Sequence, residues 1–216
     1  MSIDNPKLYY AWHLLTRLGE MQILLPAALL VILVLARRAD SRPLAYRWLV
    51  FLTLAGLTTL ASKLAFIGWG IGSAALDFTG VSGHAMFAAA VYPLLLGALA
   101  SPLRLRGQKI AVACGFALAL VVGLSRIEVG AHSVSEVLAG LLLGGVASAA
   151  AIAVASLPRV VIGSSLSVLV VAWIVLSPVH APSLPTHSMV TRLALTLSGH
   201  SVPYTRRNMM AGLQLR

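Results

Sequence analysis

Apolar runs close to the length of a membrane-spanning helix recur along the whole chain. They lie at about residues 21–36, 48–69, 83–100, 110–124, 134–157 and 160–176. A transmembrane helix needs roughly 20 mostly apolar residues to cross the hydrocarbon core. We therefore predict an all-α, polytopic membrane bundle of about six transmembrane helices, which occupies residues 21–178.

Composition and the ends of the chain agree with a single membrane domain. Hydrophobic residues make up 59% of the sequence and charged residues only 10%, whereas soluble domains carry about 25% charged residues. Tyr9, Tyr10 and Trp12 fall in the first 20 residues, and such side chains favour the headgroup level. We predict an interfacial segment over 1–20 and a basic tail over 179–216.

The distribution of basic residues predicts which loops share a side of the membrane. The formal net charge is +10. The loops after the first and third spans are basic, with Arg37, Arg38, Arg42 and Arg47 in one and Arg104, Arg106 and Lys109 in the other. Because Lys and Arg accumulate in cytoplasmic loops, these two loops are predicted to be cytoplasmic. No basic stripe is interleaved with aromatics, so we expect membrane lipids and not nucleic acid as partners.

The two remaining loops carry the residues that need a chemical explanation. Of the six acidic residues, Asp77, Glu128 and Glu136 lie in or beside these loops. His84 follows Ser82 and Gly83 at a predicted helix start. Backbone N–H groups at a helix N-terminus point outward and favour an anion. A histidine at that place is suited to contact a phosphate and to donate a proton.

The second loop contains Arg126 and His132, and Glu136 follows His132 by four positions. If the helix has begun by His132, this spacing puts the imidazole and the carboxylate on one face. A carboxylate bonded to one ring nitrogen fixes the tautomer and raises the basicity of the other nitrogen. That arrangement is what a nucleophilic histidine requires.

Each of these residues also has a plain structural explanation. Ser133 and Glu136 have the spacing of a capping box, in which the carboxylate satisfies a backbone N–H. Lys63 and Arg126 are long side chains that can extend to the membrane surface from a helix end or a loop. An ionisable residue in a membrane span is costly, so it is a candidate for a functional role. The functional interpretation also rests on all of these residues falling on one predicted side.

The sequence resembles the type 2 phosphatidic acid phosphatase (PAP2) superfamily. Two motifs carry the resemblance: Val81-Ser82-Gly83-His84, and Ser125-Arg126 followed after five residues by His132 and after three more by Glu136. The family pattern has proline at position 81 and aspartate at position 136. Its first motif is mostly missing, because Lys63 fits its lysine but Gly70 stands where arginine is expected. Arg206 or Arg207 of the tail is a possible replacement.

The resemblance implies a membrane lipid phosphatase that needs no metal and no cofactor. His132 would attack phosphorus and form a phosphohistidine, Glu136 would orient His132, and His84 would protonate the leaving oxygen. The phosphate would be bound by Lys63, Ser82, Gly83 and Arg126. The resemblance suits a bacterial inner-membrane protein, and we expect its site on the non-cytoplasmic face.

Two other functions stay open at this stage. A family member without the first motif can bind a lipid headgroup without turnover. A small proton-coupled transporter would use His84, His132 and Glu136 as a relay, although such residues are expected at mid-span beside broken helices. The oligomeric state also stays open. So does the headgroup preference, for which the candidates are phosphatidylglycerophosphate, phosphatidic acid, a polyprenyl diphosphate and lipid A phosphate.

Overall fold

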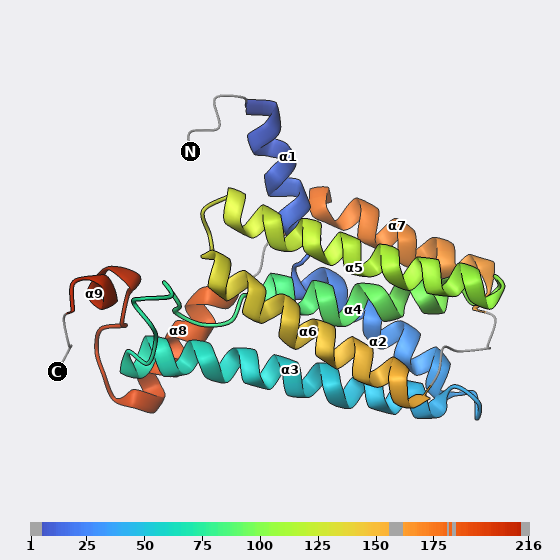
Figure 1. The fold of residues 1–216 in the computed structure, drawn as a ribbon, viewed down its shortest axis with the longest axis horizontal. Coiled ribbons are helices and arrows are strands. Elements are labelled where there is room, and N and C mark those ends of the chain that lie inside the picture. The colour runs from blue at the N-terminus through green and yellow to red at the C-terminus, as the bar shows by residue number, and fades with distance from the viewer. Residues whose placement is uncertain (1–5, 156–161, 181, 183–184, 213–216) are drawn as a thin grey trace.

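The computed structural model describes residues 6–155, 162–180, 182 and 185–212. Apart from an isolated bridge between Ser73 and Phe78, their regular elements are helices (Figure 1). These are α1 (Pro6–Arg17), α2 (Met21–Ala36), α3 (Arg42–Trp69), α4 (Gly83–Leu99), α5 (Leu105–Glu128), α6 (Val134–Ala155), α7 (Ser164–His180), α8 (Thr186–Ser198) and α9 (Arg206–Met210).

The predicted helical membrane bundle is confirmed. Four helical stretches are long and apolar enough to cross a membrane: Pro6–Ala36, Arg42–Trp69, Leu105–Glu128 and Val134–Ala153. Two shorter apolar helices, α4 and α7, lie at the two other predicted spans. The chain is thus a multi-pass membrane protein. In Figure 1, α1 runs across the bundle, while α2 to α7 run along it.

Several predicted boundaries were wrong because polar ends of helices do not show in hydropathy. The loop predicted from residue 125 begins only after Glu128, since α5 continues to that residue. Gly130, with φ of 67°, is the first residue after Arg126 that favours a turn. At the opposite end, α3 begins at Arg42 and not at residue 48, with proline in its first turn.

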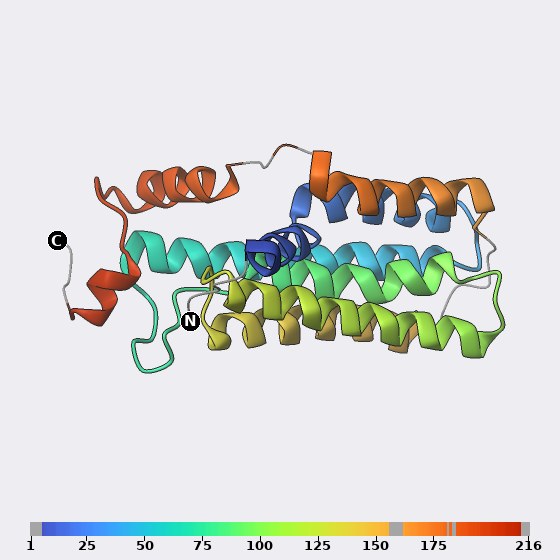
Figure 2. The ribbon, with the colours of Figure 1, turned by 90° about the horizontal axis from the view of Figure 1, so that it is seen from above.

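Helix α4 is the centre of the bundle, between α5, α6, α2 and α3 (Figure 2). Twelve of its 17 residues are buried, so α4 is covered on all sides. Trp48 of α3 donates its indole N–H to the Ala90 carbonyl at 3.0 Å, and Tyr92 donates to the Leu18 carbonyl at 2.8 Å. These bonds fix the height of α4 and therefore the position of His84 at its start.

Small residues bring α6 close against α4, as the spacing of Gly140 and Gly144 predicts. A Cβ atom at Gly140 would lie 2.5 Å from the Ser82 carbonyl oxygen. At Gly144 it would meet the Met86 carbonyl oxygen and lie 2.9 Å from the Ala90 nitrogen. The glycines therefore allow the close approach that sets α6 beside the start of α4.

The C-terminal segment forms two helices that sequence reasoning did not predict. Ala194 of α8 is fully buried in a small apolar cluster with Phe66 and Ile67 of α3. Gly199 ends α8 with φ of 73°, and Nδ1 of His200 lies 2.8 Å from the Gly68 carbonyl oxygen. Residues 198–200 thus repeat the Ser-Gly-His triplet of residues 82–84. The copy at 198–200 ends a helix, whereas the copy at 82–84 begins one.

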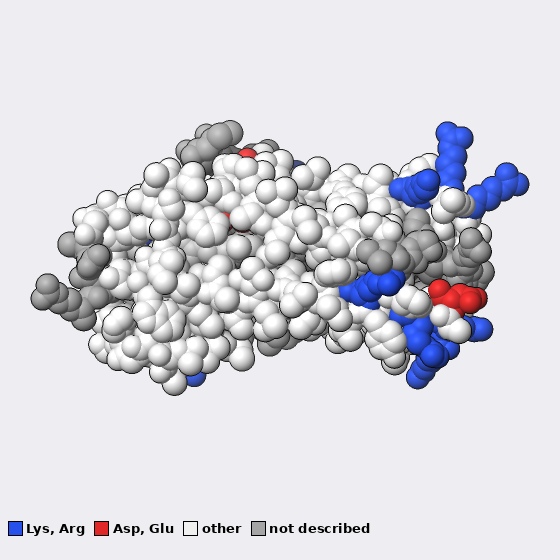
Figure 3. All heavy atoms as spheres, turned by 60° about the horizontal axis from the view of Figure 1, so that its bottom comes forward, with Lys and Arg blue, Asp and Glu red and all other residues white. Residues whose placement is uncertain are grey.

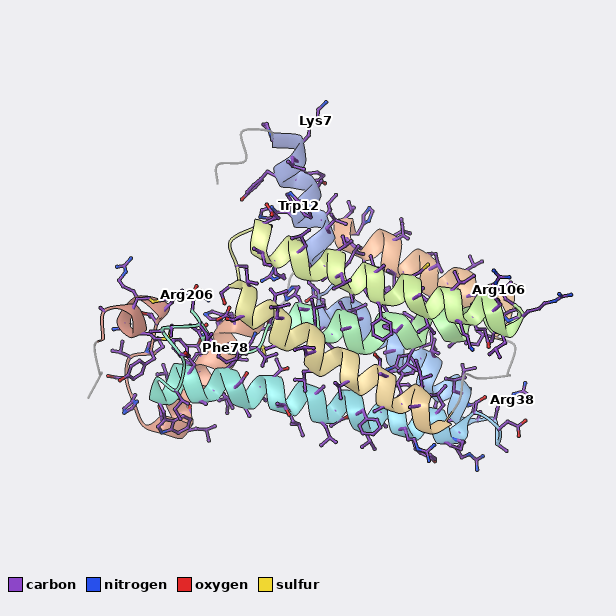
Figure 4. All side chains as sticks on the ribbon, viewed as in Figure 1. Lys7, Trp12, Arg38, Phe78, Arg106 and Arg206 are labelled. Carbon is purple, nitrogen blue, oxygen red and sulfur yellow. The ribbon has the colours of Figure 1, made fainter. Side chains whose placement is uncertain are left out.

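Charge divides the two ends of the bundle. Figure 3 shows basic side chains gathered at one end of the molecule, and Figure 4 places Arg38 and Arg106 there. Arg206 and Phe78 lie at the other end. The two basic loops therefore share an end, opposite to the loops that hold the candidate site.

Candidate active site

The residues predicted to carry the chemistry meet around one cavity of about 530 Å³ at the end of the bundle. His84 comes from the first turn of α4, Arg126 from the last turn of α5, and Lys63 from α3. The connection from α5 to α6 contributes His132, and α6 contributes Glu136. The bundle thus joins residues that are as much as 73 positions apart in the sequence.

His132 and Glu136 form a pair in which the carboxylate is fully buried and the imidazole is partly exposed. Nδ1 of His132 lies 2.7 Å from Oε2 of Glu136, whose side chain is fully buried. Because a carboxylate only accepts, Nδ1–H donates, and Nε2 is left with its lone pair. Burial lowers the pKa of His132 below its ordinary 6.5, while the hydrogen bond to Glu136 acts in the opposite direction. The imidazole is therefore held neutral near pH 7, which a nucleophile requires.

Glu136 is held from several sides. Its Oε1 accepts from the backbone N–H of Thr79 at 2.7 Å and from the Thr79 hydroxyl at 2.5 Å. The Ser133 N–H donates to Oε2 at 3.2 Å, and the Glu136 N–H approaches the Ser133 hydroxyl at 3.4 Å. The capping box and the histidine pair thus coexist, and one carboxylate serves both.

The C-terminal segment folds back into the site through Arg206, at the start of α9 (Figure 4). Its Nη2 lies 2.8 Å from Oε1 of Glu136 and its Nη1 lies 2.5 Å from Oδ2 of Asp77. Arg206 lines the cavity, whereas Arg207 is exposed and does not. The sequence had suggested no catalytic role for Asp77. Its backbone has φ of 48°, an uncommon conformation outside glycine.

Two buried polar atoms, one on Arg126 in the cavity lining and one on Ser82 outside it, lack a partner in the described part of the chain. Arg126 donates from Nη1 to the Thr16 hydroxyl at 2.7 Å, but its Nε has no partner among the described residues. The same holds within this part of the chain for the Ser82 hydroxyl. An unmade hydrogen bond at a buried polar atom costs about 1–3 kcal/mol, which an anion in the cavity would offset for Arg126.

Two predicted phosphate ligands stand away from the cavity itself. Ser82 is fully buried and donates its backbone N–H to the Glu136 carbonyl at 3.1 Å. Gly83 lines a neighbouring cavity, and a Cβ atom there would lie 3.7 Å from Nζ of Lys63. Lys63 is therefore close to the start of α4, where backbone N–H groups point outward.

The structure accounts for glycine at position 70, where the family pattern has arginine. Gly70 ends α3 with φ of 69°, which disfavours other residues. The Tyr204 ring lies 2.7 Å from the place of a Cβ atom at Gly70. The C-terminal segment thus packs against Gly70, where the first motif has arginine, and it also brings Arg206 into the lining of the cavity.

Three contacts of the site escaped sequence reasoning: Thr79 against Glu136, Thr16 against Arg126, and Asp77 against Arg206. Each joins elements that are far apart in the chain, so spacing carried no signal. For Asp77, the scarcity of acidic residues was the one available hint.

The protein is thus an all-helical membrane bundle with a His–Glu pair, Arg126 and Lys63 around one cavity at the end of its helices. The model of the PAP2 superfamily matches residues 19–159, and the chain belongs to this family. Membership supports a phosphatase-type function. A Klebsiella pneumoniae protein named "Uncharacterized 22.5 kDa protein in cps region" is 38% identical over 202 residues, which cover 92% of this chain and 97% of that protein. No solved structure matches significantly.

Proposed function

We propose that the protein is a lipid phosphatase that hydrolyses a phosphomonoester or diphosphate headgroup through a phosphohistidine on His132. The observation that carries the proposal is the 2.7 Å contact from Nδ1 of His132 to the buried Glu136. It leaves Nε2 as the nucleophilic atom, beside Arg126 and Lys63 in the same cavity.

In the first step, Nε2 of His132 attacks phosphorus and the bond from phosphorus to the leaving oxygen breaks. His84 gives its proton to that oxygen, a contribution of roughly 10²–10⁴ in rate. Glu136 stabilises the positive charge on the phosphorylated imidazole. In the second step, His84 takes a proton from water, the hydroxide oxygen bonds to phosphorus, and the N–P bond breaks to free His132 and phosphate.

The basic residues stabilise charge that develops on the phosphoryl oxygens. Arg126 and Lys63 face the cavity and offer donors at a fixed place, which costs no reorganisation during reaction. Arg206 already engages two carboxylates, so its main part is to position Glu136 and to add positive charge. The mechanism uses no metal and no cofactor, and metal-independent activity stays a prediction.

The location of the site suits a lipid substrate. The cavity lies at the ends of the apolar helices, where a lipid phosphate sits without leaving the bilayer. Because the basic loops at the other end are expected in the cytoplasm, the site is expected on the non-cytoplasmic face.

The proposal is tested by phosphate release from detergent-purified protein with EDTA present. The substrates are phosphatidic acid, phosphatidylglycerophosphate, a polyprenyl diphosphate and lipid A phosphate, and the control is His132→Ala. Release that disappears in His132→Ala is the expected result, and acid-labile phosphate on the wild-type protein would identify the intermediate. A folded protein that binds these lipids and releases no phosphate would instead be a headgroup-binding protein.

A further inference from the structure

A second cavity of about 520 Å³ lies beside the polar one. Its walls are the start of α2, one face of α3, the start of α4 and one side of α8. The α3 residues that line it recur at helical spacing: Leu49, Leu52, Thr53, Gly56, Leu57, Thr59, Leu60 and Lys63. The cavity is therefore a groove that follows α3 from the site toward the other end of the bundle.

The groove and the polar cavity are continuous. Four residues line both of them: Lys63, His84, Thr186 and Val190. Away from this junction the groove is mostly apolar, with walls from Leu25, Leu49, Leu52, Leu57, Phe87 and Met189. A molecule with a phosphate in the polar cavity and an apolar chain attached would occupy both.

The groove has the length of a lipid chain. Lys63 and Leu49 are 14 positions apart on one helix, which corresponds to about 21 Å at a rise of about 1.5 Å per residue. One leaflet contributes about 15 Å of hydrocarbon, half of the bilayer core. A chain whose headgroup is at the site would therefore run along α3 through its own leaflet.

The geometry points to the groove between α2, α3 and α8 as the subsite for an apolar chain of the lipid substrate, an inference that rests on the proposed function. Gly56 lines the groove, and a Cβ there would have no contact within 4 Å, so this position has open space for a larger side chain. Met189 and Val190 of α8 close the groove near the headgroup.

This wall makes the C-terminal segment a determinant of substrate choice. Helix α8 lies outside residues 19–159, the part that matches the family. Its Thr186 and Val190, four positions apart, face both the polar cavity and the groove. The junction between headgroup and chain is thus formed by a segment that the family match does not include.

Gly56→Phe tests the subsite by filling it. Gly56 is seven positions from Lys63, or about 10 Å along α3. Dihexanoyl phosphatidic acid ends near this point, whereas dioleoyl phosphatidic acid passes it. Leu54→Phe is the matched control, because Leu54 is 54% exposed on α3 and does not line the groove. Thermal unfolding in detergent checks that both variants fold.

The expected result is a loss that depends on chain length. Each buried methylene contributes about fourfold to binding, so excluding two or three of them lowers kcat/KM for the dioleoyl lipid about 15- to 60-fold. Hydrolysis of the dihexanoyl lipid is retained, and Leu54→Phe behaves as the wild type with both lipids. Equal losses for both lipids in folded Gly56→Phe, or no loss for either, would overturn the subsite.

A second measurement does not depend on turnover, so it separates failure of the subsite from failure of the proposed function. A phosphatidic acid with a diazirine at its chain end is bound to His132→Ala protein, irradiated, and the adducts are mapped by mass spectrometry. Adducts at Leu49, Leu52 or Leu57 that Gly56→Phe removes support the subsite. Adducts spread over the outer faces of α5 and α7, and unchanged by Gly56→Phe, contradict it.

Discussion

At the residue scale, the site depends on how one buried carboxylate is shared. Glu136 accepts from His132 with one oxygen and from Thr79 and Arg206 with the other. The family pattern has aspartate at position 136, and the aspartate side chain is shorter than that of glutamate by one methylene. Three separate segments therefore meet at a single side chain, and changes at any of them are expected to act through His132.

The pH dependence of the reaction is expected to report His132. The nucleophile must be neutral, and burial lowers its pKa below 6.5, so the acidic limb of kcat/KM, which reports His132, should lie below that value. Glu136→Gln removes interactions that raise this pKa, so the acidic limb should move to still lower pH while the rate falls at every pH. Measurement of kcat/KM between about pH 4 and 8 checks both effects. An acidic limb that moves upward in Glu136→Gln would contradict this assignment.

Arg206 is expected to act as a positioning residue. Arg206→Ala removes a hydrogen bond to the charged Glu136. Such a bond contributes about 1.5–3 kcal/mol, so its loss is expected to lower kcat roughly 10- to 100-fold. Arg206→Lys should restore part of it. The neighbouring Arg207→Ala, which changes an exposed side chain, is the control. A change confined to KM would show that Arg206 binds substrate instead.

At the element scale, the distance between α4 and α6 determines whether His84 and His132 face the same cavity. The contact relies on glycine, since Gly140 touches Ser82, the residue before α4. The two motifs therefore meet through backbone packing at the start of α4.

Gly144→Ala is expected to destabilise the protein by about 1–3 kcal/mol, because its Cβ would press on the backbone of α4 and overpack the contact. Gly145→Ala on the same helix is the matched control. Its Cβ would lie 3.8 Å from the Phe116 ring, and alanine gains up to about 1 kcal/mol of helix propensity. Thermal unfolding in detergent should show a lower Tm for the first variant and an equal or higher Tm for the second. Equal Tm values for both would argue against a tight α4–α6 contact.

At the scale of the whole molecule, charge and chemistry occupy opposite ends of the bundle. The basic loops lie at the end with Arg38 and Arg106, and the cavity lies at the end with Arg206 (Figures 3 and 4). The positive-inside rule then predicts that the site faces away from the cytoplasm.

Cysteine labelling in spheroplasts tests this orientation. In a Cys114→Ser background, Ala131→Cys lies at the end with the site and Arg104→Cys at the basic end, and both positions are exposed. A membrane-impermeant maleimide should label position 131 without lysis and position 104 only after lysis. The reverse pattern would place the site in the cytoplasm.

The sequence by itself determined the helical membrane bundle and the shared end of the basic loops, and it predicted that His84, Arg126, His132 and Glu136 lie together. Hydropathy and short-range spacing are local properties, so these features can be read along the chain. Only the tertiary structure decided that Arg206 reaches Glu136 and that α8 borders the site. Arg206 contacts Glu136 across 70 positions and Asp77 across 129. No periodic pattern encodes such contacts, because they arise from the packing of the C-terminal segment on α3.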